Sequence, residues 1–261
     1  LPHDGDRRGH NDGARLSGVV DDRRQTDETL VNELDVQPPC AAILHGYGGS
    51  KNDSLLAAPM LVSSGFAVLA LDAQYHGERK QSGKDIFSID FQSDRDAMIQ
   101  TIIDWRRGID YLQTRPEIDM DRLALVGGSM GGILGGVLTA LDERIKAAGL
   151  LVAGGDWGSL IMKSQIPQAV KIRQLVPNLT EESVSQLMDP VDPLHFVGRI
   201  APRPLLMQNG KKDTIVIPEC SQRLFEAAKD PKEIDWYESN HDIPVVQALP
   251  RLIAWLKKNL Q

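Results

Sequence analysis

Residues 123–132 read LALVGGSMGG, an apolar, strand-like run that passes through glycines and a serine into a helical run over 133–141. The serine, Ser129, has a glycine two positions before it and another two positions after it. A serine at a sharp turn from a strand into a helix has a strained backbone, and side chains at those two positions would collide. The spacing Gly-x-Ser-x-Gly in this context therefore predicts a nucleophilic serine at the end of a strand.

A nucleophilic serine needs a base to take its proton and a third group to orient that base. At this type of turn the chain order is serine, then acid, then histidine. Only His195 and His241 follow the serine. His195 precedes any strand that could present an acid, whereas His241 lies in a polar loop between an expected last strand, 234–237, and a C-terminal helix. We therefore predict His241 as the base.

The acid is also expected in a loop at the carboxyl end of a strand. Asp213 follows the apolar run Leu205-Leu206-Met207 and a short turn, and it precedes His241. The other candidate acids have simpler explanations. Asp189 and Asp192 each precede a proline. Asp242 directly follows His241, and Glu219 begins a helix. We therefore predict Asp213 as the acceptor of the imidazole N–H.

Backbone donors for an oxyanion are expected in the loop 45–50, HGYGGS, which follows the first central strand. Its glycines allow the backbone to turn N–H groups toward the serine. The predicted donors are the N–H of Tyr47 and the N–H of Met130. A phosphate loop would need a Gly-Lys-Ser/Thr ending, and a dinucleotide site would need a third glycine and a downstream acid. His45 is expected to support the loop rather than to carry a proton.

Two further segments are candidates for the substrate pocket. Tyr75 and His76 leave the strand-like run 66–71 at its carboxyl end, and the alternative is that their loop is only structural. Trp157 begins an apolar group that could form an acyl pocket or, equally, the core of an inserted segment; the group continues with Leu160, Ile161 and Met162.

Apolar runs of strand length alternate with helical patterns along the chain. The runs lack polar alternation, which is typical of strands covered on both faces of a parallel sheet; they are 41–44, 66–71, 123–126, 147–152 and 205–207. Helical periodicity marks 54–64, 94–113 and 245–260. The alternation predicts a doubly wound α/β domain. Residues 154–200, with two helical patterns, interrupt it and are expected to form a lid.

The composition and the ends of the chain narrow the class of protein. Lys and Arg total 29 against 36 Asp and Glu, a net charge of −7, which argues against a nucleic-acid partner. No run approaches the roughly 18 apolar residues of a membrane helix. No secretory signal is visible, so a cytoplasmic protein is expected, with residues 1–15 as a flexible lead-in. Cys40 and Cys220 belong to no Cys/His cluster, so no metal site is expected.

In their order and spacing, these motifs resemble the α/β-hydrolase superfamily, and within it the small esterases related to dienelactone hydrolase and to the catalytic domain of prolyl oligopeptidase. The matching segments span most of residues 36–261; they are 45–49, 72–77, 127–131, 202–213 and 240–241. The resemblance implies one α/β-hydrolase domain over 1–261, with a mostly parallel central sheet, helices on both faces and a small helical lid insertion at about 154–200. It also implies a serine carboxylesterase that forms an acyl-enzyme, needs no cofactor and takes a small-molecule ester.

Two departures from the family pattern refine this expectation. Dienelactone hydrolases use a cysteine nucleophile where this chain has Ser129, and 261 residues leave no room for the propeller of the oligopeptidases. An insertion this short favours short or medium acyl chains. The alternatives are a thioesterase or a peptidase or amidase using the same residues, and a hydrolase fold that binds a ligand without catalysis. The sequence predicts no particular oligomeric state.

Overall fold

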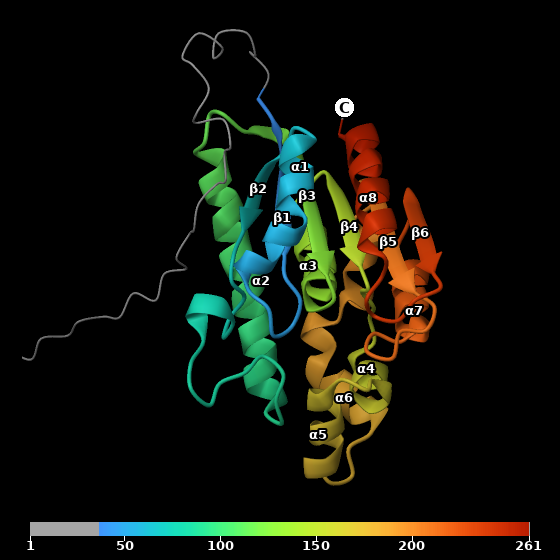
Figure 1. Ribbon diagram of the computed structural model, residues 1–261. Helices are drawn as coiled ribbons and strands as arrows, with labels where there is room; N and C mark the ends of the chain where they lie inside the picture. The colour runs from blue at the N-terminus through green and yellow to red at the C-terminus, as the bar shows by residue number, and fades with distance from the viewer. Residues whose placement is uncertain (1–36, 261) are drawn as a thin grey trace, which may run out of the picture.

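The computed structural model describes residues 37–260. Their strands form one six-stranded sheet in the order β2-β1-β3-β4-β5-β6, in which every neighbouring pair is parallel. The strands are β1 (Pro39–Leu44), β2 (Ala67–Ala70), β3 (Asp119–Gly128), β4 (Ala147–Leu151), β5 (Leu205–Gly210) and β6 (Lys232–Tyr237). Because the strands are parallel, all of them end at one edge of the sheet (Figure 1).

Helices cover both faces of this sheet (Figure 1). One face packs against α2 (Phe91–Gln113), α3 (Met130–Leu141) and α7 (Pro218–Ala227), and the other packs against α1 (Ala58–Ser63) and α8 (Val245–Asn259). Successive residues of β1 alternate between the two cores, with Ala42 in the first and Ala41 and Ile43 in the second. Burial on both faces explains the continuous apolar runs. The predicted α/β-hydrolase fold is confirmed.

The helix expected over 54–64 is divided in two. A 3₁₀ segment, η2 (Lys51–Leu56), precedes α1, and Pro59 occupies the first turn of α1, where proline is tolerated but cannot extend a helix that began earlier. Ser50 caps η2 by accepting the N–H of Asn52 at 3.3 Å.

At the other end of the chain, Val245 is exposed rather than buried, because it begins α8 at the edge of the core.

Residues between β4 and β5 extend beyond the carboxyl edge of the sheet (Figure 1). They form three α-helices rather than the two patterns expected: α4 (Trp157–Lys163), α5 (Pro167–Leu175) and α6 (Glu181–Met188). The 3₁₀ turns η4 (Asp189–Val191), η5 (Pro193–His195) and η6 (Val197–Arg199) follow; a further one, η3 (Gly77–Arg79), lies after β2. Pro167 starts α5, and Thr180 caps α6 by accepting the N–H of Ser183 at 3.1 Å, which separates the two helices.

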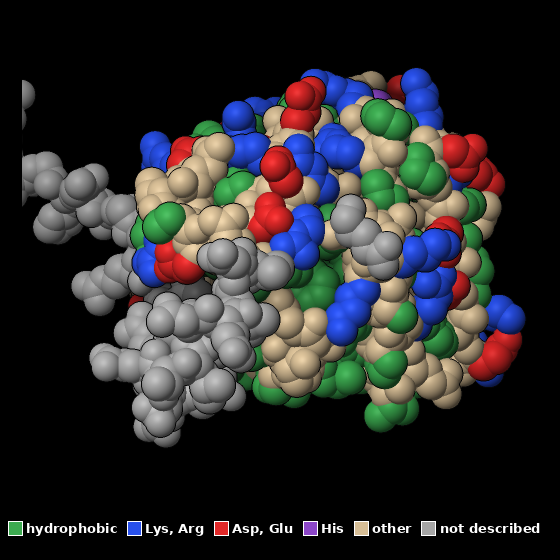
Figure 2. Space-filling view, turned by 90° about the horizontal axis from the view of Figure 1, so that it is seen from above, with side chains coloured by type: hydrophobic (Ala, Val, Ile, Leu, Met, Phe, Trp, Pro, Cys, Tyr) green, Lys and Arg blue, Asp and Glu red, His purple; other side chains and the backbone are tan. Residues whose placement is uncertain are grey.

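At the opposite end of the sheet lie the amino ends of the strands, away from Ser129. On the part of that face visible in Figure 2, Lys and Arg side chains are intermixed with Asp and Glu. Among the helices of residues 37–260, none combines the length and the apolarity needed to cross a bilayer. The lead-in predicted over 1–15 lies outside the described residues.

Candidate active site

Ser129 occupies the turn between β3 and α3 with φ 53° and ψ −120°, a conformation that residues other than glycine rarely adopt. Its N–H donates to the carbonyl of Leu151 at the end of β4, at 2.9 Å. A Cβ on Gly127 would overlap the backbone of Gly131, and a Cβ on Gly131 would overlap the backbone at the end of β1. The two flanking glycines are therefore required by close backbone approach, as the motif predicts.

Substitution of Gly131 tests this packing. A Cβ there would meet the backbone oxygens of Leu44 and His45, which cannot rotate away. We expect Gly131→Ala to lower the free energy of unfolding by about 2 kcal/mol, as overpacked cores do. Gly128→Ala is the matched control, because a Cβ at Gly128 meets nothing within 4 Å. Urea unfolding of both variants measures the difference, and equal stabilities would contradict the packing argument.

Ser129, His241 and Asp213 form a continuous chain of hydrogen bonds. Oγ of Ser129 lies 2.9 Å from Nε2 of His241, and Nδ1 of His241 lies 2.7 Å from Oδ2 of Asp213. The other carboxylate oxygen, Oδ1, accepts the backbone N–H groups of Ile215 at 2.7 Å and Val216 at 3.0 Å. A carboxylate in this position accepts the Nδ1–H of the ring, so Nε2 is the nitrogen that can take a proton from Oγ.

The loops that carry the acid and the histidine are paired beyond the ends of their strands. Lys211 N–H donates to the carbonyl of Tyr237 at 2.8 Å, and Lys212 N–H donates to the carbonyl of Ser239 at 2.9 Å. A Cβ on Gly210 would overlap the carbonyl oxygens of Ser239 and Asn240, so glycine permits this approach. His195, the other histidine after the serine, is exposed and contacts Asp189 instead, with 2.7 Å between Nε2 and Oδ1.

Two backbone N–H groups lie beside the serine. Met130 begins α3, and the first N–H groups of a helix have no acceptor within it. The loop after β1 reaches the same place, since a Cβ on Gly46 would lie 3.6 Å from Cβ of Ser129. Among residues 37–260, the N–H groups of Tyr47 and Met130 donate to no backbone carbonyl. Both remain available to a ligand oxygen.

His45 holds the loop after β1 against the loop after β2. Its Nε2 accepts the N–H of Ala73 at 3.0 Å, and its Nδ1 lies 2.8 Å from the carbonyl of Gly46. Burial lowers the pKa of His45 below its ordinary value, which favours the neutral ring. A neutral ring that accepts at Nε2 donates at Nδ1, so both contacts are satisfied. The geometry agrees with a supporting role.

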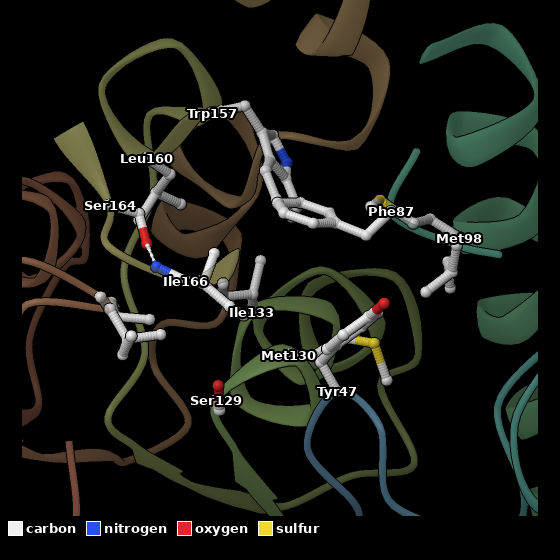
Figure 3. Close-up of a pocket in the computed structure, with 13 residues that line it drawn as sticks. Tyr47, Phe87, Met98, Ser129, Met130, Ile133, Trp157, Leu160, Ser164 and Ile166 are labelled. Carbon is white, nitrogen blue, oxygen red and sulfur yellow. Dashed lines mark hydrogen bonds between the residues drawn. The ribbon is translucent and has the colours of Figure 1, made fainter. Parts of the chain in front are cut away.

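An apolar pocket opens above Ser129 (Figure 3). Its volume is about 50 Å³, and its walls come from the loop 80–90, α2, α3, the insertion and the loop after Asp213; they include Phe87, Met98, Ile133, Trp157, Leu160 and Val216. The ring of Trp157 lies 5.9 Å from that of Phe87, which lies 5.8 Å from that of Tyr47. Tilted aromatic contacts of this kind stabilise the packing of the pocket walls.

Trp157 lines this pocket and also belongs to the core beneath the insertion. Leu160 also lines the pocket, whereas Ile161 and Met162 are absent from its walls. His76 does not line this pocket, because its buried ring packs 5.3 Å from the ring of His45. Tyr75 is also absent from its walls and lines a neighbouring hollow instead.

Sequence reasoning missed two acidic residues that position the pocket. Asp192, set aside as the catalytic acid because it precedes a proline, accepts the N–H of Trp157 at 2.9 Å and that of Leu194 at 3.0 Å. Burial raises the pKa of Asp192 above its ordinary value. Asp85 accepts the hydroxyl of Tyr47 at 2.7 Å. The position of Asp192 directly before a proline was a usable signal for a helix cap, but nothing local in the sequence pairs Asp85 with Tyr47.

The chain matches the prolyl oligopeptidase family over residues 56–260. It is 30% identical to YtaP of Bacillus subtilis (strain 168) over 212 residues, which cover 75% of this chain and 68% of that protein. It is 25% identical to the esterase YjfP of Escherichia coli (strain K12) over 204 residues, 77% of this chain and 78% of the other. The chain belongs to the prolyl oligopeptidase family and is a hydrolase.

Solved structures agree with the fold. The acetyl xylan esterase from Paenibacillus sp. R4 superposes with a TM-score of 0.73 at 23% identity, over 87% of this chain and 77% of that one. The similarity confirms the α/β-hydrolase architecture. The superposition covers most of this chain, so the similarity is not limited to the local sequence motifs.

Proposed function

We propose that this hydrolase is a serine carboxylesterase that cleaves short- to medium-chain carboxylic esters through an acyl-enzyme. The observation that carries the proposal is the chain of contacts from Oγ of Ser129 to His241 at 2.9 Å and from His241 to Asp213 at 2.7 Å. The esterase YjfP among the relatives supports the ester as the bond that is cleaved. The insertion over 154–200 acts as the lid that roofs the acyl pocket.

The reaction follows from the placement of these groups. Oγ of Ser129 attacks the ester carbonyl as Nε2 of His241 takes its proton, and Asp213 stabilises the imidazolium that forms. The N–H groups of Tyr47 and Met130 stabilise the oxyanion, each contributing about 3 kcal/mol to the transition state. The imidazolium then protonates the departing alcohol. A water molecule, deprotonated by His241, attacks the acyl-enzyme and releases the acid.

The size of the pocket limits the acyl chain. A cavity of about 150 Å³ holds a benzene molecule, and this pocket has about 50 Å³. Its walls are apolar and packed against the core, so they widen only if a side chain moves. Hydrolysis of esters from acetyl to palmitoyl is expected to be fastest at the short end. A maximum at palmitoyl would contradict the assignment.

Phe87→Ala should shift this preference toward longer chains. The ring is half-buried and forms one wall of the pocket, so its removal extends the space available to the acyl group. We expect kcat/KM for an octanoyl ester, relative to the acetyl ester, to rise about ten-fold, since two or more additional buried methylenes contribute about 0.8 kcal/mol each. Phe225→Ala is the control, because Phe225 is equally half-buried but lies on α7 away from the pocket.

Esters, thioesters and anilides of one acyl group distinguish the proposal from its nearest alternatives. The three substrates present the same acyl group to the pocket and differ only in the bond that is cleaved. We expect kcat/KM to be highest for the ester, with the alcohol and the thiol chosen to have matched pKa values. Preference for the anilide would favour a peptidase or amidase, and preference for the thioester would favour a thioesterase.

A further inference from the structure

A second hollow lies next to the acyl pocket. It has a volume of about 510 Å³, against about 50 Å³ for the acyl pocket, and Phe87 forms part of the wall of both. One side is the loop 80–90 and the other is α5 of the insertion; the lining includes Tyr75, Lys84, Asp85, Asp90, Lys171 and Leu175. The two hollows are therefore neighbours that share the side chain of Phe87 as a wall.

The loop that forms one side is fixed by hydrogen bonds. Oδ2 of Asp85 accepts the hydroxyl of Tyr47 at 2.7 Å, and Oδ1 accepts the N–H groups of Ile86 at 2.7 Å and Phe87 at 3.2 Å. Further along, both oxygens of the buried Asp94 accept bonds from Ser88, at 2.7 Å each. The hollow is therefore preformed, and both oxygens of Asp85 are already hydrogen-bonded to protein donors.

The cations of the hollow have no such partners. Within residues 37–260, neither Lys84 nor Lys171 has a carboxylate oxygen within 4.0 Å. The second carboxylate of the lining, Asp90, accepts the N–H of Ser93 at 3.1 Å and its hydroxyl at 2.7 Å. The acidic groups are thus hydrogen-bonded within the protein but keep their charges, and Lys84 also interacts electrostatically with Asp90. Neither ammonium group makes a direct ion pair within residues 37–260, so both can still contact a ligand.

We propose that this hollow binds an anionic group of the substrate, a carboxylate or a phosphate, through Lys84 and Lys171. The inference rests on the proposed function, because Ser129 would cleave the ester that carries the anionic group. The small apolar pocket then holds the part of the substrate next to the carbonyl, and the hollow holds its charged end. The charged end belongs either to the alcohol or to the acyl chain, and the two cases have separate tests.

Two matched pairs of esters separate these cases. On the alcohol side, 4-carboxyphenyl acetate is compared with 4-carbamoylphenyl acetate. On the acyl side, the 4-nitrophenyl monoester of glutaric acid is compared with the ester in which a carboxamide replaces the free carboxylate. For each pair, the ratio of kcat/KM for the charged to the neutral ester is measured in the unmodified protein and in Lys84→Ala/Lys171→Ala.

For one of the pairs, the ratio should fall about five-fold in the double variant, as expected for loss of partly exposed ion pairs. Lys84→Arg/Lys171→Arg should keep the ratio within about two-fold, because it retains both charges. Lys257→Ala/Lys258→Ala should also keep it, since it makes the same change in net charge at the far end of α8. Ratios unchanged by loss of Lys84 and Lys171 in both pairs would overturn the proposal.

A binding measurement separates failure of this inference from failure of the esterase assignment. Ser129→Ala lacks the nucleophile, so calorimetric titration with the same esters reports affinity without turnover. In that background, loss of both lysines should weaken binding of a charged ester about five-fold and leave its neutral partner unaffected. Equal affinities with and without the lysines would refute the anionic site, whereas absence of ester hydrolysis in the unmodified protein would refute the proposed function instead.

Discussion

Ser129→Ala is expected to lower kcat/KM for a short-chain ester by about 10⁴-fold or more. The substitution removes the oxygen that lies 2.9 Å from Nε2 of His241 and leaves no other hydroxyl in its place. The strained φ of 53° persists because the neighbouring backbone imposes it, so the fold and the pocket are retained. Hydrolysis rates and thermal unfolding of the purified variant measure both effects.

Ser221→Ala is the matched control for this prediction. Ser221 is buried on α7, outside the pocket, and within residues 37–260 its Oγ has no hydrogen-bond partner. The same chemical change there should leave the rate within about two-fold, since no bond to the reacting groups is lost. Full activity in Ser129→Ala would show that another group is the nucleophile.

Asp213→Asn is expected to lower kcat by about 10⁴-fold with little change in structure. The amide oxygen can replace Oδ1 as the acceptor for Ile215 and Val216, which places the NH₂ group toward His241. Nδ1 of the ring must then accept, so Nε2 carries the hydrogen and faces Ser129. A ring in that tautomer cannot take the proton from Oγ.

Asp242→Asn makes the same isosteric change one residue after the histidine. Asp242 is exposed, and no hydrogen bond links it to the ring of His241. We expect its rate to stay within about three-fold of the unmodified protein. A loss in Asp213→Asn no larger than the loss in Asp242→Asn would mean that Asp213 does not set the tautomer of His241.

Most of the sheet and the triad geometry follow from local sequence. The strands from β1 to β5 contain apolar runs, as expected for parallel strands covered on both faces. The edge strand β6 is only partly buried and is expected from its place before the C-terminal helix. The loops after β3, β5 and β6 then meet at one edge of the sheet. The turn at Ser129 is equally visible, because only glycine at 127 and 131 permits the backbone contacts it makes. Order along the chain then selects His241 over His195.

The pocket could not be predicted in the same way, because its walls come from segments far apart in the sequence. Phe87 meets Trp157 across 70 positions, and no periodic pattern links a residue of an irregular loop to one in an insertion. The sequence also did not indicate that the ring of His76 would be buried against His45, because that contact joins loops after two different strands. The number of helices in the insertion depended on caps such as Thr180 rather than on periodicity.

A fluorophosphonate probe tests whether Ser129 is an activated nucleophile. Such a probe phosphonylates a serine whose hydroxyl transfers its proton to a neighbouring base, and mass spectrometry of the digested protein locates the adduct. We predict one adduct per chain, on Ser129, and none in Ser129→Ala. A folded protein that is not labelled, or that is labelled on a different residue, would show that Ser129 is not the activated nucleophile.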